Sequence, residues 1–134
     1  MTTISVENRL AIHELIAEYS HCVDNYRGED WAGLFLEDGK LVGTDNPFLG
    51  RQALIDQADA LKNGPTEYRH LITNVYIQPG ASDEHAVALA YGTVGDWAHK
   101  PAVMSIFVEY RFELVRRDES WQIAELRVHM PYGL

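Results

Sequence analysis

Asp24 and His70 are the two residues whose side chains best suit proton transfer. A carboxylate that accepts a hydrogen bond from one imidazole nitrogen fixes the ring tautomer and makes the other nitrogen a better base. If the fold brings the two side chains together, His70 can therefore remove a proton from a substrate. Each residue also has a structural interpretation, because Asp24 can cap the turn over 25–28 and His70 can be a packing residue of a strand.

Three further polar residues suit the binding of a substrate oxygen. Asn74 follows His70 by four positions, so in a regular strand its amide lies on the same face and can donate to a carbonyl or a developing oxyanion. Tyr19 and Tyr110 lie at inward, apolar positions and carry hydroxyl groups that need partners when buried. The structural alternatives are an amide that fastens a loop and tyrosines that only fill the core. The pattern indicates no more than a core or rim position for Trp31.

Metal and cofactor sites have no support in the sequence. The six histidines and the single cysteine form no His-x-x-x-His or Cys-x-x-Cys spacing that would hold zinc. No glycine-rich dinucleotide loop, phosphate loop or Gly-x-Ser-x-Gly turn is present. We therefore expect a site without metal, without cofactor and without a serine nucleophile.

The apolar spacing predicts helices in the first half of the chain. Residues 6–24 carry apolar side chains at steps of three and four, which indicates a helix capped by Ser5. A short helix is expected after Gly28, with Phe35 on its inner face and an end at 37–39. The rest of this half is expected to form a strand over 40–44, a turn at 46–47 and a helix over 50–62.

The second half of the chain changes to the spacing of strands. Long strands are expected over 68–78, 85–97, 102–115 and 120–130. Because short turns separate them, they should form an antiparallel meander. In the third of these strands the even positions from Met104 to Leu114 are apolar, whereas positions 109, 111 and 113 are charged. The apolar set is expected to face the core.

Helices followed by strands indicate an α+β fold, in which three N-terminal helices cover a curved antiparallel sheet and enclose a pocket. The 134 residues fit a single domain over 1–134. A net charge of -9 argues against a nucleic-acid partner, and the lack of 18 consecutive apolar residues argues against a membrane span. A cytoplasmic location is expected by default.

The chain resembles the SnoaL-like branch of the nuclear transport factor 2-like superfamily over nearly its full length. The segments that carry the resemblance are 12–24, Trp31-x-x-Leu34-Phe35-x-x-Asp38-Gly39, Arg69-His70-x-x-x-Asn74 and Arg116-Arg117-Asp118-x-x-Trp121-x-Ile123. The resemblance implies the cystatin-like fold of that superfamily, a cone of curved sheet closed by helices. A pocket inside the cone is therefore expected.

Within this superfamily the sequence is similar to scytalone dehydratase and hexachlorocyclohexane dehydrochlorinase, whose Asp and His dyad falls on Asp24 and His70. The similarity implies proton abstraction followed by β-elimination. Tyr19 and Leu126 stand where the dehydrochlorinase has basic residues, so assistance to a departing halide is not expected. The same alignment implies a pocket wall made of Tyr19, Leu41, Tyr91, Ile106, Tyr110, Leu126, Val128 and Met130.

Two functions from different classes remain open. The first is a cofactor-independent lyase or isomerase, with dehydratase-like elimination, that acts on a small apolar, aromatic or polycyclic molecule. The second is a noncatalytic module of the same fold that binds a hydrophobic ligand or serves as a structural subunit. The partly apolar convex face, with Val103, Phe107 and Val115, also predicts a homodimer or a higher homo-oligomer.

Overall fold

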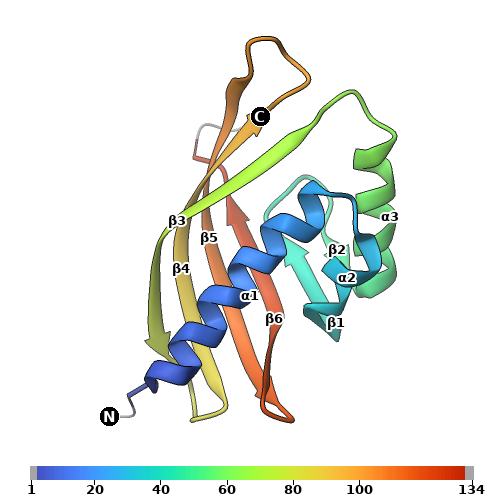
Figure 1. Cartoon of the computed structure of the whole chain (residues 1–134). Coiled ribbons are helices and arrows are strands. Elements are labelled where there is room, and N and C mark those ends of the chain that lie inside the picture. Colours follow the sequence, from blue (N-terminus) through green and yellow to red (C-terminus); the bar gives the residue numbers. More distant parts are fainter. Residues whose placement is uncertain (1–2, 132–134) are drawn as a thin grey trace.

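The structure, a computed structural model, describes residues 3–131, so the predicted domain ends at 1 and 134 lie outside the described part. Its helices are α1 (Val6–Asp24), α2 (Gly28–Gly33) and α3 (Arg51–Lys62). Its strands are β1 (Phe35–Val42), β2 (Phe48–Leu49), β3 (Tyr68–Pro79), β4 (His85–Asp96), β5 (Val103–Arg117) and β6 (Ser120–His129). Figure 1 shows the helices on one side of a long sheet. None of the helices within residues 3–131 is long and apolar enough to cross a membrane.

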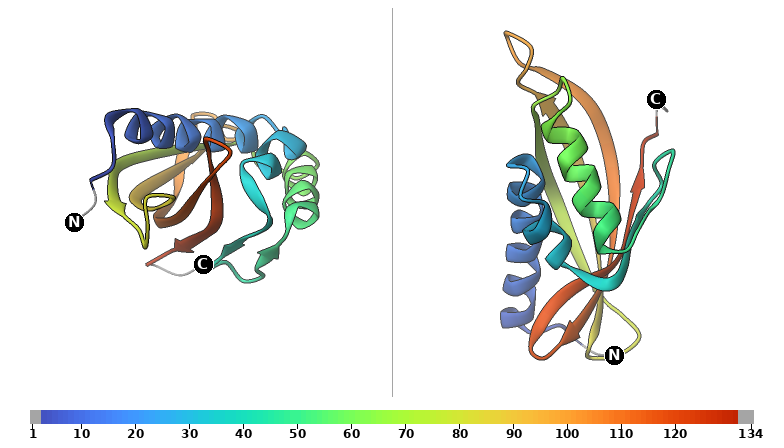
Figure 2. Two further views of the ribbon diagram at one scale, coloured as in Figure 1. Left: turned by 90° about the horizontal axis from the view of Figure 1, so that it is seen from below. Right: turned by 90° about the vertical axis from the view of Figure 1, so that its right-hand side faces the viewer.

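One curved sheet forms the body of the described part, with the strand order β2-β1-β6-β5-β4-β3. Strands β3 to β6 form the expected antiparallel meander. The helices cover the concave side of this sheet, and Figure 2 shows the strands curving beneath them. The predicted α+β cone, closed by helices from the first half of the chain, is therefore confirmed.

The prediction of a purely antiparallel sheet is wrong, because β1 pairs with β6 in parallel. β1 enters the sheet from α2 and lies beside the last strand, with Leu41 opposite Leu126. The chain then returns as β2, which pairs antiparallel with β1. No hairpin joins β1 to β6, so no turn sets their relative direction.

The boundary between α2 and β1 also differs from the prediction. α2 ends at Gly33, and Phe35 already belongs to the strand instead of the helix. Gly39, which was expected to end the helix, lies inside β1, where a Cβ atom would be 2.9 Å from the carbonyl oxygen of Ile123. The absence of a side chain at Gly39 lets β6 approach the irregular stretch of β1 between Phe35 and Lys40.

Two β-bulges place on the outer face of the sheet side chains that regular alternation would place in the core. One lies in β3 between Thr73 and Tyr76, and after it Tyr76 is 62% exposed. The other lies where Val94 and Gly95 pair with β5, and it leaves Met104 52% exposed, although this residue was expected to face the core. One extra residue shifts a period-two pattern by one position, so every assignment beyond the bulge changes face.

The core lies between α1 and the concave face of the sheet. Ser5 caps α1 as expected, because its side chain accepts a hydrogen bond from the backbone N–H of Asn8 at 3.1 Å. Tyr19, on the buried stripe of α1, meets three aromatic rings at centroid distances of 5.8, 6.4 and 6.0 Å, namely those of Trp31, Phe35 and Phe112. These contacts fix the second half of α1 against α2, β1 and β5.

Asp96, the last residue of β4, binds the backbone just before β3 and the backbone of the turn that follows β4. Its Oδ1 accepts from the backbone N–H groups of Glu67 and Ala98 at 3.0 and 2.9 Å, and these bonds lower the pKa of the carboxyl group. We expect Asp96→Ala to lower the thermal unfolding midpoint by several degrees, because two backbone donors lose their acceptor.

The effect of Asp96→Ala should depend on pH. A lowered pKa means that the charged form stabilises the fold, so the difference from wild type is full above about pH 4 and shrinks as the pH falls further. Scanning calorimetry of both proteins at about pH 7 and about pH 3 measures this difference. An equal loss of midpoint at both values would contradict the role of the carboxylate.

Candidate active site

Asp24 and His70 are brought together by the end of α1 and the start of β3. Asp24 is the last residue of α1, and Tyr26 just beyond it has a positive φ of 59°, which turns the chain away from the helix. His70 lies near the start of β3, opposite Val94 of β4. α1 packs along β3, so the two side chains meet although they are 46 positions apart in the sequence.

Both carboxylate oxygens of Asp24 form hydrogen bonds with His70. Oδ1 lies 2.5 Å from the ring atom Nδ1, and Oδ2 accepts from the backbone N–H of His70 at 2.8 Å. Because an ionised carboxylate can only accept, Nδ1 carries the hydrogen and the lone pair of the imidazole is on Nε2. Nε2 has no hydrogen-bond partner among the described residues. The arrangement therefore presents one oriented base nitrogen.

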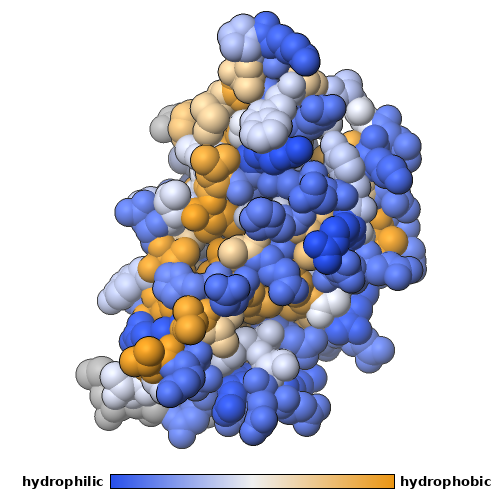
Figure 3. Space-filling model, in the orientation of Figure 1, coloured by the Kyte–Doolittle hydropathy of each residue, from blue (hydrophilic) through white to orange (hydrophobic). Residues whose placement is uncertain are grey.

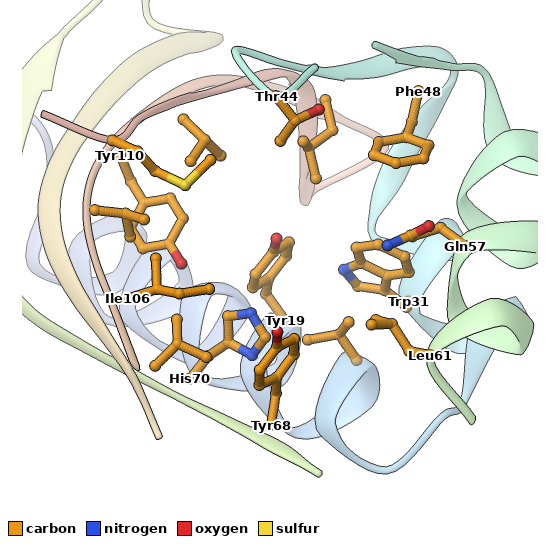
Figure 4. A pocket seen from close by; sticks show the side chains of 16 residues that line it. Tyr19, Trp31, Thr44, Phe48, Gln57, Leu61, Tyr68, His70, Ile106 and Tyr110 are labelled. Atoms are coloured by element: carbon orange, nitrogen blue, oxygen red, sulfur yellow. The ribbon is translucent and has the colours of Figure 1, made fainter. Parts of the chain in front are cut away.

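A cavity of about 190 Å³ lies between the concave face of the sheet and the helices, and the ring of His70 forms part of its wall, as Figure 4 shows. Asp24 stands behind His70 and is only 7% exposed. The sheet contributes an apolar wall made of Leu41, Val94, Ile106, Val108 and Val128, which Met130 extends just beyond the end of β6. None of the described lining residues is Asp, Glu, Lys or Arg. The cavity therefore suits an uncharged and largely apolar molecule.

Tyr19 and Tyr110 bring hydroxyl groups into this apolar space, where Figure 4 shows both oxygens on the cavity side of their rings. Burial raises the pKa of Tyr19 well above its ordinary value, and the nearby Tyr110 and the charge of Asp24 add to the rise. Burial, followed by the charge of Asp24, also raises the pKa of Tyr110. Both phenols therefore stay protonated through neutral and mildly alkaline pH and act as hydrogen-bond donors.

Most residues that the resemblance assigned to the pocket wall do line this cavity, namely Tyr19, Leu41, Ile106, Tyr110, Val128 and Met130. Leu126 does not, because it is completely buried within the core. Tyr91 does not either, since it lies on the outer face of β4 and is 58% exposed. The inward position beside it belongs to Gly92, where a Cβ atom would collide with the ring of Tyr110.

Asn74 is also outside the site, contrary to the prediction that it shares a face with His70. It lies at the bulge of β3 with a positive φ of 55°, and its side chain is exposed. Asparagine adopts this backbone region more readily than most residues. The backbone conformation at the bulge therefore explains an asparagine at position 74, and its amide does not line the cavity.

Sequence patterns did not reveal the wall that faces His70 from the helical layer. This wall comes from α2, β2 and α3, together with the loop after β1, and consists of Trp31, Thr44, Phe48, Gln57 and Leu61 (Figure 4). Tyr68, at the start of β3, lines the cavity beside His70, with ring centroids 6.3 Å apart. The amphipathic pattern of the third helix was the only available signal, because it turns Leu61 inward. The other positions depend on how the helices fold back over the sheet.

The dyad does not resemble a metal site. Within residues 3–131 no group of three or more His, Cys, Asp or Glu side chains could hold a metal ion. Both oxygens of Asp24 are already engaged by His70, which leaves a single imidazole nitrogen. The one cysteine, Cys22, is buried in the stripe of α1.

The sequence profile of the SnoaL-like domain matches residues 5–127, which is most of the chain. The chain belongs to the SnoaL-like family. This confirms the resemblance drawn from the sequence, and the cystatin-like and nuclear transport factor 2-like descriptions of its structural neighbours agree with the fold. No curated protein matches the chain.

Solved structures similar to this SnoaL-like protein come from several bacteria. A protein of unknown function from Mycobacterium tuberculosis has 29% identity and a TM-score of 0.83, over 90% of this chain and 70% of the other. A protein of unknown function with a cystatin-like fold from Nostoc punctiforme has 20% identity and a TM-score of 0.86, over 98% of each chain. A Novosphingobium aromaticivorans protein, provisionally described as a scytalone dehydratase, has 20% identity and a TM-score of 0.83, over 97% of this chain and 88% of the other.

Proposed function

We propose that this SnoaL-like protein is a cofactor-independent lyase or isomerase, in which His70 removes a proton from carbon and Asp24 orients His70. The observation that carries the proposal is that Asp24 binds both the ring Nδ1 and the backbone N–H of His70. This leaves the imidazole lone pair on Nε2, at the wall of an apolar cavity. The provisional description of one structural neighbour as a scytalone dehydratase agrees with this reaction class.

The reaction requires a carbon whose hydrogen is made acidic by a neighbouring carbonyl group. His70 Nε2 takes the proton, the C–H electron pair forms the double bond of an enolate, and the negative charge passes to the carbonyl oxygen. In elimination the carbonyl re-forms, a new carbon–carbon double bond appears, and a hydroxyl on the β-carbon leaves with the proton from His70 as water. In isomerisation the same proton returns to another carbon. Neither reaction changes the oxidation state of a cofactor.

The volume of the cavity indicates the size of molecule that it can enclose. A cavity of roughly 150 Å³ accepts benzene in a protein interior, and the cavity here measures about 190 Å³. A molecule of one ring or two small fused rings therefore fits within this volume. We propose a one- or two-ring, uncharged substrate.

The ketone 2-tetralone tests this proposal, because it is a neutral two-ring molecule with acidic hydrogens next to its carbonyl. We expect the protein in D₂O to accelerate the entry of deuterium into 2-tetralone, measured by mass spectrometry, beyond the rate with an equal concentration of free imidazole. A ketone that binds without accelerated exchange would favour the alternative, a noncatalytic module for hydrophobic ligands. The cytoplasmic location stays a prediction from the sequence.

We also propose that the outer face of the sheet binds a second copy of this chain. An apolar band crosses β3, β4 and β5 and consists of half-exposed side chains, namely Leu71, Tyr91, Met104 and Phe107. Figure 3 shows a different side of the molecule, on which α1 lies in front, and apolar side chains also gather there along α1 and β3. Beside the band, β5 and β6 carry charges of both signs, namely Glu109, Arg111, Glu113, Glu125 and Arg127. A face with both signs can complement itself across a two-fold axis, which favours a homodimer.

Sedimentation of the wild type and of Phe107→Glu measures this association. We expect a dimer at micromolar concentration for the wild type and a shift toward monomer for the variant, because a charge in the apolar band must lose water on pairing. Val6→Glu is the matched control, since Val6 is 79% exposed on α1. Of the other residues predicted for this face, Val103 is 41% exposed and Val115 is half-buried. A wild type that sediments only as a 15.2 kDa species would contradict the proposal.

A further inference from the structure

Gln57 places a polar side chain on the apolar stripe of α3. This stripe consists of Leu54, Ala58 and Leu61, and Leu61 lines the cavity one helical turn after Gln57. Leu54 and Ala58 are completely buried, whereas Gln57 is half-buried and lines the cavity. The inner face of an amphipathic helix ordinarily carries apolar residues, so an amide at this position calls for an explanation.

The amide of Gln57 forms no side-chain hydrogen bond with any residue in the described part of the chain. By contrast, the amide of Gln52 on the same helix donates to Asp56 at 2.9 Å. A side-chain amide offers two donor hydrogens and one acceptor oxygen. Solvent can satisfy a half-buried amide, but a ligand that fills the cavity displaces this solvent. The ligand must then replace the lost hydrogen bonds, or it binds less tightly.

Gln57 lies across the cavity from His70. Figure 4 shows its amide beside the ring of Trp31, on the opposite side of the cavity from the imidazole. Val108 and Val128 of the sheet also line the cavity, and their side chains offer no hydrogen bond. A ligand whose reacting carbon lies at His70 can therefore bring its far end to Gln57.

Trp31 also carries an unpaired donor in this helical wall. Its side chain is 2% exposed, and its indole Nε1 is buried without a hydrogen-bond partner among the described residues. A ligand cannot reach a nitrogen that is fully buried, whereas it can reach the half-buried amide of Gln57. The rings of Trp31 and Phe48 line the cavity together with this amide. They provide aromatic surfaces that suit a planar ring system.

The neutrality of the wall decides which ligand group Gln57 can bind. None of the described lining residues is Asp, Glu, Lys or Arg. A carboxylate would lose its water without gaining a cation, and it would leave the amide oxygen of Gln57 without a donor. A hydroxyl meets the amide through a single oxygen atom. A lactam or carboxamide presents an N–H beside a C=O, so two parallel hydrogen bonds can satisfy both halves of the Gln57 amide.

We propose that Gln57 is a specificity-determining residue, which binds a neutral lactam or carboxamide group of the ligand at the end remote from His70. This inference rests on the proposed function only for the statement that the reacting carbon lies at His70. The binding preference itself requires no turnover, so it can be measured with compounds that do not react.

Three two-ring compounds of nearly the same shape test this preference: 2-tetralone, the lactam dihydroquinolin-2-one and the N-methyl derivative of this lactam. The lactam has an N–H where 2-tetralone has a CH₂ group beside its carbonyl, and the N-methyl derivative keeps the carbonyl but loses the donor. We expect calorimetry to show that the wild type binds the lactam roughly 10-fold more tightly than either of the other compounds.

Gln57→Leu should abolish this preference, because leucine suits the helix and the apolar stripe but forms no hydrogen bond. Gln52→Leu is the matched control, since Gln52 is exposed on the same helix and does not line the cavity. We expect Gln52→Leu to prefer the lactam as the wild type does.

The wild-type protein gives a second readout of the Gln57 amide. We expect the lactam, but not 2-tetralone, to shift the side-chain NH₂ resonances of Gln57 in ¹⁵N spectra, where their loss in Gln57→Leu assigns them. Equal shifts with both compounds would overturn the proposal. It would also be overturned if the wild type bound the lactam no more tightly than the N-methyl derivative, or if Gln57→Leu kept the preference for the lactam.

The exchange measurement with 2-tetralone separates this inference from the proposed function. His70→Gln should stop deuterium exchange and keep the preference for the lactam, since the amide of Gln57 is intact. Accelerated exchange by the wild type without a preference for the lactam would leave His70 as a base and remove the role of Gln57. A preference for the lactam without accelerated exchange would keep the role of Gln57 and remove the proposed reaction.

Discussion

Replacing His70 with Gln is expected to lower the exchange of 2-tetralone hydrogens by roughly 100- to 10,000-fold, the range that general-base catalysis contributes. Gln has no group that accepts a proton near neutral pH, yet it is polar and of similar size. Its amide can still donate to Asp24, so the fold should survive. Mass spectrometry of the deuterated ketone gives the rates, and circular dichroism checks the folding.

His85→Gln is the matched control for this prediction. His85 is exposed at the start of β4, where its ring pairs with Ser82 at 2.7 Å, and it does not line the cavity. We expect His85→Gln to exchange the ketone at the wild-type rate. A His70→Gln protein that folds and keeps the wild-type exchange rate would show that His70 is not the base.

Asp24→Asn should lower turnover by on the order of 100-fold or more while changing ketone affinity little. The amide keeps the shape of the carboxylate, but it can turn its NH₂ group toward Nδ1 and select the tautomer whose hydrogen is on Nε2. His70 would then present a hydrogen to the substrate in place of a lone pair. The loss should therefore appear in kcat, with KM and the calorimetric Kd nearly unchanged.

Two outcomes would contradict the dyad. Near wild-type exchange by both His70→Gln and Asp24→Asn would favour the noncatalytic binding module. Unfolding of both variants would instead support the structural interpretation of the pair, because Asp24 also accepts from the backbone N–H of His70 at 2.8 Å.

The sequence was most informative where a single local pattern decides the outcome. The stripe of α1 ends at Asp24, and the long β-type runs predicted the meander, so the two elements that hold the dyad could be predicted before the structure. The pairing of Asp24 with His70 was a hypothesis from the chemistry of the two residues, and the family resemblance supported it, since periodicity alone cannot bring together residues 46 positions apart.

The wrong predictions concern side chains whose face of the sheet depends on the pairing register, where a shift of one residue moves a side chain to the opposite face. Asn74 and Met104 were assigned inward by alternation, and a bulge in each strand pair turned both away from the core. Bulges depend on the partner strand, which the local sequence does not contain. Trp31 was recognised as an aromatic of the core or rim, but its unpaired N–H appears only when α2 folds over the sheet.

The parallel pairing of β1 with β6 has a consequence for the order of folding. The meander from β3 to β6 forms from neighbouring hairpins, whose loops are short and close quickly, whereas β1 must wait for the last strand. Leu41 and Val128 both belong to the cavity wall, and they come from these two distant strands. During synthesis the cavity therefore cannot be complete until β6 has left the ribosome.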